Sequence, residues 1–141
     1  MTVRKVKSVW NGTLKDGSGK MDITGYSGPF TFATRFENAK GTNPEELVGA
    51  AQSGCYSMFL SALITGEGLN PESIETSASV TLGELDGGPA ITNIKLETVV
   101  KCEGLSQEKF AELSVVAKEK CPISRLYAGG TASIELDAKL V

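Results

Sequence analysis

The sequence predicts an α+β fold in which antiparallel sheets surround a buried central helix. Several segments alternate apolar and polar residues at the period of a strand, and two longer segments repeat apolar residues at the period of a helix. The predicted order is strands, helix, strands, helix and strand. A chain of 141 residues with 40% hydrophobic residues and no repeat or linker suits a single domain, residues 1–141.

The first part of the chain predicts an antiparallel meander. Strands are expected over Val3–Trp10, over a short second segment, Thr13–Lys15, and over Met21–Tyr26, with Gly-containing turn sequences between them. From Phe30 to Phe36, three phenylalanines alternate with other residues, which predicts another strand with its aromatic side chains on one face. Arg35 is then expected on the opposite face.

A central helix is predicted from Asn43 to Thr65. Asn43 is a favourable N-cap, Pro44 suits the first helical position, and Glu46 can complete a capping box. Gly66 is expected to end the helix. After Glu46 the segment has no charged residue, so we expect the helix to be buried on most sides. Its apolar residues recur at helical spacing: Leu47, Val48, Ala51, Cys55, Met58, Phe59, Ala62 and Leu63.

The central helix is long enough to suggest a membrane span, which needs about 20 apolar residues. Polar and small residues argue against a span: Gln52, Ser53, Gly54, Ser57, Ser61 and Thr65. We therefore expect a core helix of a soluble protein. The small residues from Gly49 to Gly54 leave room for a second helix to approach closely.

The second half of the chain predicts three strands and a helix. Strands over Ile74–Leu82, Ile91–Cys102 and Thr131–Leu140 each place alternate apolar residues on one face. Ser106 is expected to cap a helix that runs to about Lys120.

Cys121 is expected at the start of a short helix. Pro122 suits a first helical position, and the residue before a proline is pushed away from helical angles. The local positive potential at such a helix start favours a thiolate.

The composition argues against several functional classes. A net charge of -3 without a Lys/Arg cluster argues against nucleic-acid binding. The first residues lack the apolar core and cleavage site of a signal peptide, and three cysteines suit reduced thiols, so we expect a cytoplasmic protein.

The sequence contains no histidine, which excludes Ser-His-Asp and Cys-His activation and removes the usual ligands of catalytic zinc. No Gly-rich nucleotide-binding loop follows a predicted strand. Three scattered cysteines without a Cys-x-x-Cys pair argue against a zinc site, so the chemistry would rest on Cys, carboxylates, Arg or Lys, Tyr, or a cofactor. Cys55 alone would suit inert packing, but a second thiol at a helix start favours redox chemistry, and Cys102 is assigned no role.

Three motifs carry a resemblance to a known family. They are Phe32-Ala33-Thr34-Arg35-Phe36-Glu37, the run from Gly41 to Ala51 followed by Cys55, and Cys121-Pro122-Ile123-Ser124. In this order and spacing they resemble the OsmC/Ohr family of osmotically inducible and organic hydroperoxide resistance proteins, over essentially the whole chain. An arginine within Thr-Arg-Phe-Glu is similar to the OsmC branch, whereas Gln52-Ser53-Gly54 departs from the more usual Ala-rich approach to the cysteine.

The resemblance implies an OsmC-like fold and a cysteine-based peroxidase that acts on organic hydroperoxides and, less well, on hydrogen peroxide, in oxidative or osmotic stress. Cys55 would attack the O–O bond and become a sulfenic acid, and Cys121 would condense with it to a disulfide. A dithiol, in the family often a lipoylated protein, would reopen the disulfide. Neither a metal nor a flavin is implied.

Burial raises the pKa of a thiol, so a peroxidatic cysteine in an apolar helix needs a nearby cation. A guanidinium about 4 Å away at an effective dielectric near 20 favours the thiolate by about 4 kcal/mol, or roughly 3 pKa units before desolvation is subtracted. Arg35 is the candidate cation, and Glu45 is the candidate carboxylate that holds it. Without the motif, we would interpret Arg35 as an ordinary exposed strand residue and Glu45 as a first-turn carboxylate favoured by the helix dipole.

Glu45 lies ten residues before Cys55, about 15 Å along a helix, so it cannot contact the thiol of its own chain. Either Arg35 spans this gap or a partner subunit supplies the charge. We expect an intertwined homodimer with the active sites at or near the interface. The alkyl part of the substrate is expected to rest against Phe36, Phe59, Leu63 or Leu126.

Two other functional classes stay open at this point. A non-catalytic relative could bind a small hydrophobic ligand, although such a protein needs neither Arg35 nor Cys121. A structural or interaction protein is the third possibility.

Overall fold

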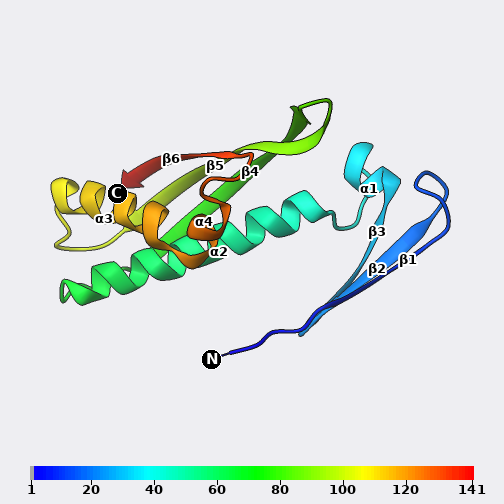
Figure 1. Cartoon of the computed structure of the whole chain (residues 1–141). Coiled ribbons are helices and arrows are strands. Elements are labelled where there is room, and N and C mark those ends of the chain that lie inside the picture. Colours follow the sequence, from blue (N-terminus) through cyan, green and yellow to red (C-terminus); the bar gives the residue numbers. More distant parts are fainter. Residues whose placement is uncertain (1) are drawn as a thin grey trace. The chain divides into compact units, whose positions relative to one another are not determined.

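The structure is a computed structural model that describes residues 2–141. The chain forms two compact units, one ending at Leu47 and one running from Val48 to Val141, and each is described by itself. Strands and helices occur in the order expected from the sequence, so the α+β class is confirmed (Figure 1). The assignment of residues 1–141 to one domain stays a prediction.

The first unit contains a three-stranded antiparallel meander. Its strands are β1 (Lys7–Asn11), β2 (Ser18–Ile23) and β3 (Tyr26–Thr31), in the order β1-β2-β3. The predicted strand Thr13–Lys15 is wrong, because this segment belongs to the loop between β1 and β2. The Thr13 hydroxyl accepts a hydrogen bond from the Asp16 amide at 3.2 Å, which favours a turn over an extended strand.

The segment Phe32–Phe36 is a short helix, α1, and not the predicted strand. Thr31 and Thr34 form a reciprocal cap, in which each side-chain oxygen accepts from the other residue's backbone amide at 3.1 and 2.9 Å. Phe32 and Phe36, which helped to suggest a period of two, are also four residues apart, as on one face of a helix. Their ring centroids lie 4.8 Å apart. Arg35 therefore lies in the last turn of a helix.

The second unit contains a sheet of β4 (Ser73–Leu85), β5 (Gly88–Lys101) and β6 (Ser133–Leu140), in the order β4-β5-β6. β4 and β5 are antiparallel, and their hairpin turns at Asp86-Gly87, where both residues have positive φ. β6 pairs with β5 in parallel, which differs from the antiparallel sheets that we expected. Two helices lie between β5 and β6 in the chain, and such a crossover allows parallel pairing.

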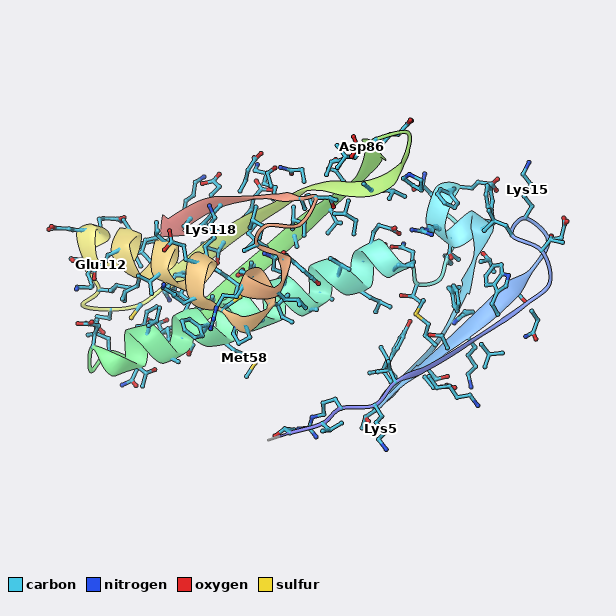
Figure 2. All side chains as sticks on the ribbon, viewed as in Figure 1. Lys5, Lys15, Met58, Asp86, Glu112 and Lys118 are labelled. Atoms are coloured by element: carbon cyan, nitrogen blue, oxygen red, sulfur yellow. The ribbon has the colours of Figure 1, made fainter. Side chains whose placement is uncertain are left out.

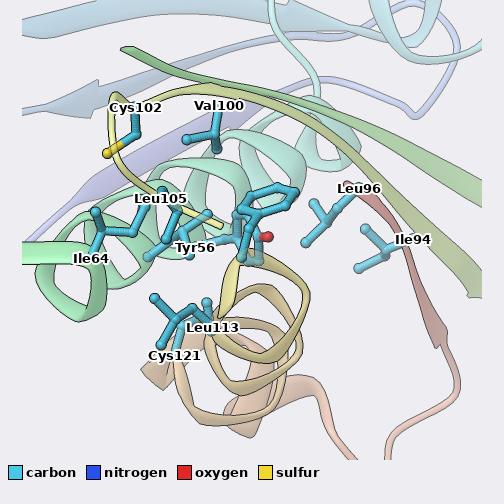
Figure 3. Close-up of a cluster of buried hydrophobic side chains, with 12 residues drawn as sticks. Tyr56, Ile64, Ile94, Leu96, Val100, Cys102, Leu105, Leu113 and Cys121 are labelled. Carbon is cyan, nitrogen blue, oxygen red and sulfur yellow. The ribbon is translucent and has the colours of Figure 1, made fainter. Parts of the chain in front are cut away.

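Three helices pack on one face of this sheet: α2 (Pro44–Gly66), α3 (Gln107–Lys120) and α4 (Pro122–Tyr127) (Figure 1). The predicted caps are present, since the Asn43 side chain accepts from the Glu46 amide and Ser106 accepts from the Lys109 amide. The core between helices and sheet is apolar and fully or nearly buried (Figure 3); among its members are Tyr56, Leu60, Ile64, Ile94, Leu96, Val100, Phe110, Leu113 and Ala117.

α2 is buried on one face only, and not on most sides as expected. Its fully or largely buried residues form a single stripe: Gly49, Gln52, Tyr56, Leu60 and Ile64. At Gly49 the helix approaches β4 so closely that an added Cβ would lie 3.1 Å from Val80 Cγ2. Met58 projects away from the core and is 77% exposed (Figure 2).

By length and composition alone, α2 could cross a membrane. The core helix of a soluble protein passes the same test, so this property is weak support for a span. The buried stripe of α2 instead packs within the core described above.

Candidate functional site

Cys55 and Cys121 lie beside each other in the second unit. Cys55 comes from the middle of α2 and is half-buried, whereas Cys121 lies between α3 and α4 and is fully buried. Both are free thiols. Desolvation raises the pKa of Cys55, the Cys121 thiol raises it further, and a hydrogen bond from the Ile123 backbone partly opposes this rise. The Cys121 thiol therefore lies close enough to Cys55 to act on its pKa.

Local sequence places Cys121 at this position. α3 ends as Cys121 adopts a non-helical conformation (φ -59, ψ 139), and Pro122 begins α4. The Cys121 sulfur then accepts a hydrogen bond from the Ser124 amide at 3.3 Å. The prediction that Cys121 lies at a helix start is confirmed.

Buried polar side chains surround Cys121, and sequence reasoning did not select them. Ser124 Oγ lies 3.1 Å from the Cys121 sulfur and accepts a hydrogen bond from Gln52 Nε2 at 3.2 Å. Tyr56 and Ser114 are also buried nearby, and desolvation raises the pKa of Tyr56 to about 12. A sequence signal for Gln52 existed, because it is the only long polar side chain in the uncharged part of α2.

The expected contact between Arg35 and Glu45 is present in the first unit. Arg35 Nε lies 3.1 and 3.2 Å from the two carboxylate oxygens, and Nη2 lies 2.6 Å from Oε1. The Glu45 side chain is 12% exposed and that of Arg35 is 36% exposed. Two guanidinium nitrogens on one carboxylate fix the orientation of Arg35.

An apolar hollow of about 210 Å³ adjoins Arg35 within the first unit. Its lining is mainly aromatic and aliphatic: Trp10, Leu14, Phe30, Thr31, Phe32, Arg35, Phe36 and Pro44. Of these residues, sequence reasoning selected only Arg35 and Phe36. The others come from β1 and β3, from α1, whose helical turn was not foreseen, from the loop after β1 and from the start of α2.

The other residues expected to contact substrate lie in the second unit. Phe59 and Leu63 are half-buried on α2 and pack against the core. Leu126 is 72% exposed and lines a separate hollow with Val48, Ile91 and Tyr127 among others. The four expected substrate residues are therefore divided between the two units.

Residues 2–141 contain no group of three or more His, Cys, Asp or Glu side chains placed to hold a metal ion. Cys102, which was assigned no role, is 6% exposed at the end of β5, and its sulfur lies 3.8 Å from the Glu103 carbonyl oxygen.

The comparisons with known proteins agree on one family. A family model described as OsmC-like protein matches residues 37–137. Peroxiredoxin OsmC of Escherichia coli (strain K12) is 41% identical over 146 aligned residues, which cover 99% of each chain. Organic hydroperoxide resistance protein OhrB of Bacillus subtilis (strain 168) is 32% identical over 123 residues, which cover 83% of this chain and 88% of that protein.

Solved structures give the same fold. An OsmC-like protein from Mycoplasma pneumoniae superposes with a TM-score of 0.80 at 15% identity, covering 99% of this chain and 98% of that chain. The OhrB structure from Bacillus subtilis has a TM-score of 0.65 at 25% identity, covering 97% of this chain and 98% of that one. The chain belongs to the OsmC-like protein family.

Proposed function

We propose that this protein is a cysteine-based peroxidase that reduces organic hydroperoxides to alcohols. The observation that carries the proposal is the proximity of two reduced thiols, one half-buried on α2 and one fully buried at the start of α4. The names of the relatives, peroxiredoxin and organic hydroperoxide resistance protein, support a peroxidase and a role in stress.

In the first step, the Cys55 thiolate attacks the terminal oxygen of the hydroperoxide. The O–O bond breaks, an S–O bond forms, and the alkoxide leaves and takes a proton to become the alcohol. In the second step, the Cys121 thiolate attacks the sulfur of the Cys55 sulfenic acid. A disulfide forms, and hydroxide leaves as water after protonation. A dithiol reductant, such as a protein-bound lipoyl group, restores both thiols.

The first step requires a cation near Cys55. Within residues 48–141, desolvation and the Cys121 thiol raise the pKa of Cys55, and only the Ile123 backbone opposes them, so this unit alone favours the unreactive thiol. In our proposal, Arg35, held by Glu45, supplies the missing charge. The bidentate contact supports this role because it presents the guanidinium in a fixed orientation.

We propose that the working unit is a homodimer. α2 exposes an uncharged face with small residues, including Ala51, Gly54 and Ala62 around Met58. A second copy of α2 could pack closely there and cover Met58. The Arg35–Glu45 pair acting on each Cys55 could then come from either subunit.

The apolar hollow beside Arg35 suits the alkyl or aryl part of the substrate, and it favours organic hydroperoxides over hydrogen peroxide. Phe36 lines this hollow. Phe59, Leu63 and Leu126 are retained as further candidates for the second unit. A cytoplasmic location also stays a prediction.

The test is one equivalent of cumene hydroperoxide added to the fully reduced protein. We expect the loss of two free thiols and a disulfide that mass spectrometry of peptides assigns to Cys55 and Cys121. Cys55→Ser should abolish peroxide consumption, and Cys102→Ala should leave it unchanged. A protein that keeps all its thiols while binding the unreacted hydroperoxide would instead be a ligand-binding relative without catalysis.

A further inference from the structure

The environment of Cys121 contains more polar structure than a merely packed thiol needs. Gln52 is 0% exposed and Ser124 is 2% exposed, although both are polar and lie against the apolar core. Their side chains contact each other at 3.2 Å, and Ser124 contacts the Cys121 sulfur at 3.1 Å. Burying such groups is unfavourable unless their hydrogen bonds are satisfied.

The hydrogen bonds around Ser124 are better satisfied when Cys121 is a thiolate. While Cys121 is a thiol, Ser124 Oγ accepts from both the thiol and Gln52 Nε2. The proton of the Ser124 hydroxyl then has no acceptor other than that sulfur among the contacts of residues 2–141. Once Cys121 loses its proton, the hydroxyl can donate to the sulfur, which also accepts from the Ser124 amide at 3.3 Å.

Gln52 decides which way the Ser124 hydroxyl points. With Nε2 directed at Ser124 Oγ, the amide occupies the oxygen and leaves its proton for the sulfur. Its Oε1 is left buried without a partner among the described residues, an arrangement that is unfavourable by itself. The reverse orientation would let Oε1 accept the hydroxyl proton and remove it from Cys121.

We propose that Gln52 and Ser124 are positioning residues for the second step of the reaction, in which they direct a hydroxyl proton to the Cys121 sulfur and so promote its attack on the Cys55 sulfenic acid. This inference rests on the proposed function. It concerns disulfide formation and not the first attack on peroxide. Ser124 acts on the sulfur directly, and Gln52 acts through Ser124.

The experiment separates the two chemical steps in the full-length protein. Reduced protein is mixed with one equivalent of cumene hydroperoxide across a pH series, and residual peroxide and the Cys55–Cys121 disulfide are measured in parallel after rapid acid quenching. Ser124→Ala should leave peroxide consumption within about twofold and slow disulfide formation about tenfold, the size expected for one hydrogen bond to a charged group. The pH profile of disulfide formation should move to higher pH.

Three further variants test the assignment. Gln52→Met, a near-isosteric change without donors, should slow disulfide formation in the same direction, and Ser124→Thr, which keeps the hydroxyl, should restore most of it. Ser114→Ala is the matched control, because Ser114 is another buried serine near Tyr56 and its hydroxyl has no hydrogen bond to Cys121 within residues 2–141. Equal disulfide rates and pH profiles in wild type, Ser124→Ala and Gln52→Met would overturn the inference.

A second measurement does not depend on peroxidase activity. In a Cys55→Ser, Cys102→Ala background, only Cys121 contributes thiolate absorbance at 240 nm. Adding Ser124→Ala should lower this absorbance at a fixed pH near 8, and an unchanged absorbance would refute the role of the hydroxyl. If wild type forms no disulfide although Ser124→Ala lowers this absorbance, then the proposed function fails and the positioning of Cys121 stands.

Discussion

Tyr56→Phe tests the polar environment beneath the two cysteines through the stability of the fold. Tyr56 is fully buried on α2, and its hydroxyl lies near Ser114 without a well-formed hydrogen bond within the described residues. Desolvation raises the pKa of Tyr56 from 10.0 to about 12, the Ser114 side chain opposes part of this rise, and the charge of the Cys121 thiolate adds to it. The folded protein therefore prefers the protonated phenol more strongly than the unfolded chain does.

The sign of the pH dependence follows from this preference. Because the folded pKa is the higher one, the stabilisation is complete below about pH 10 and is lost as the pH rises towards 12. A difference of about two units corresponds to roughly 2.7 kcal/mol in full, of which about 1.4 kcal/mol is lost by pH 11. Tyr56→Phe has no phenol to ionise, so its stability should fall less over this range.

The assay is urea unfolding of wild type and Tyr56→Phe at pH 8, 10 and 11, with Tyr26→Phe as the control because Tyr26 is 47% exposed. Near pH 8 Tyr56→Phe should be as stable as wild type or slightly more stable, since the lost hydroxyl has no good partner. By pH 11 its advantage should have grown by about 1.4 kcal/mol. If the free energies of unfolding of the two proteins change equally with pH, the inference that the Tyr56 phenol is buried and desolvated is wrong.

Three further predictions follow from the site and the core. Arg35→Ala and Glu45→Gln should each lower kcat/KM for cumene hydroperoxide by at least about tenfold without lowering the melting temperature. The control variant Arg4→Ala should leave kcat/KM unchanged. Full activity in Arg35→Ala would remove this residue from the site. Leu60→Ala should destabilise the protein by about 2–5 kcal/mol in urea unfolding, because Leu60 is 0% exposed. Met58→Arg should weaken self-association in sedimentation velocity, and an active wild-type monomer at working concentration would contradict the dimer.

Much of the second unit could be predicted because its periodicities are unambiguous. Alternate residues of β5 from Ile94 to Val100 are buried as the pattern indicated, and Ser106 and Asn43 cap the helices that they were expected to cap. The first unit was harder, because apolar residues at positions 30, 32 and 36 satisfy both a strand and a helical turn. The reciprocal Thr31–Thr34 cap favours the helix. This cap spans only four residues, so in the sequence it is no stronger an indication than the alternation that suggested a strand.

The burial of α2 could not be read from its sequence for a different reason. Its uncharged part is apolar or small on every side, so composition gives no preferred face. The face that the second unit covers is set by the close approach at Gly49 and by hydrogen bonds from Ser57 to Thr76 and onward to Thr98, all of which depend on strands later in the chain. What remains exposed, around Met58, is then too apolar to be an ordinary solvent-facing surface.

The same dependence on distant residues explains why the candidate site was found only in part. Cys55, Cys121, Arg35 and Glu45 were selected from motifs, and each half of that set lies together in its own unit, the thiols in one and the ion pair in the other. Gln52 and Ser124 meet across 72 positions of sequence, and an amide within an apolar helix carries no local sign of its partner. A buried glutamine is nevertheless unfavourable unless its hydrogen bonds are used, so its presence in the uncharged part of α2 indicates a constraint that packing alone does not impose.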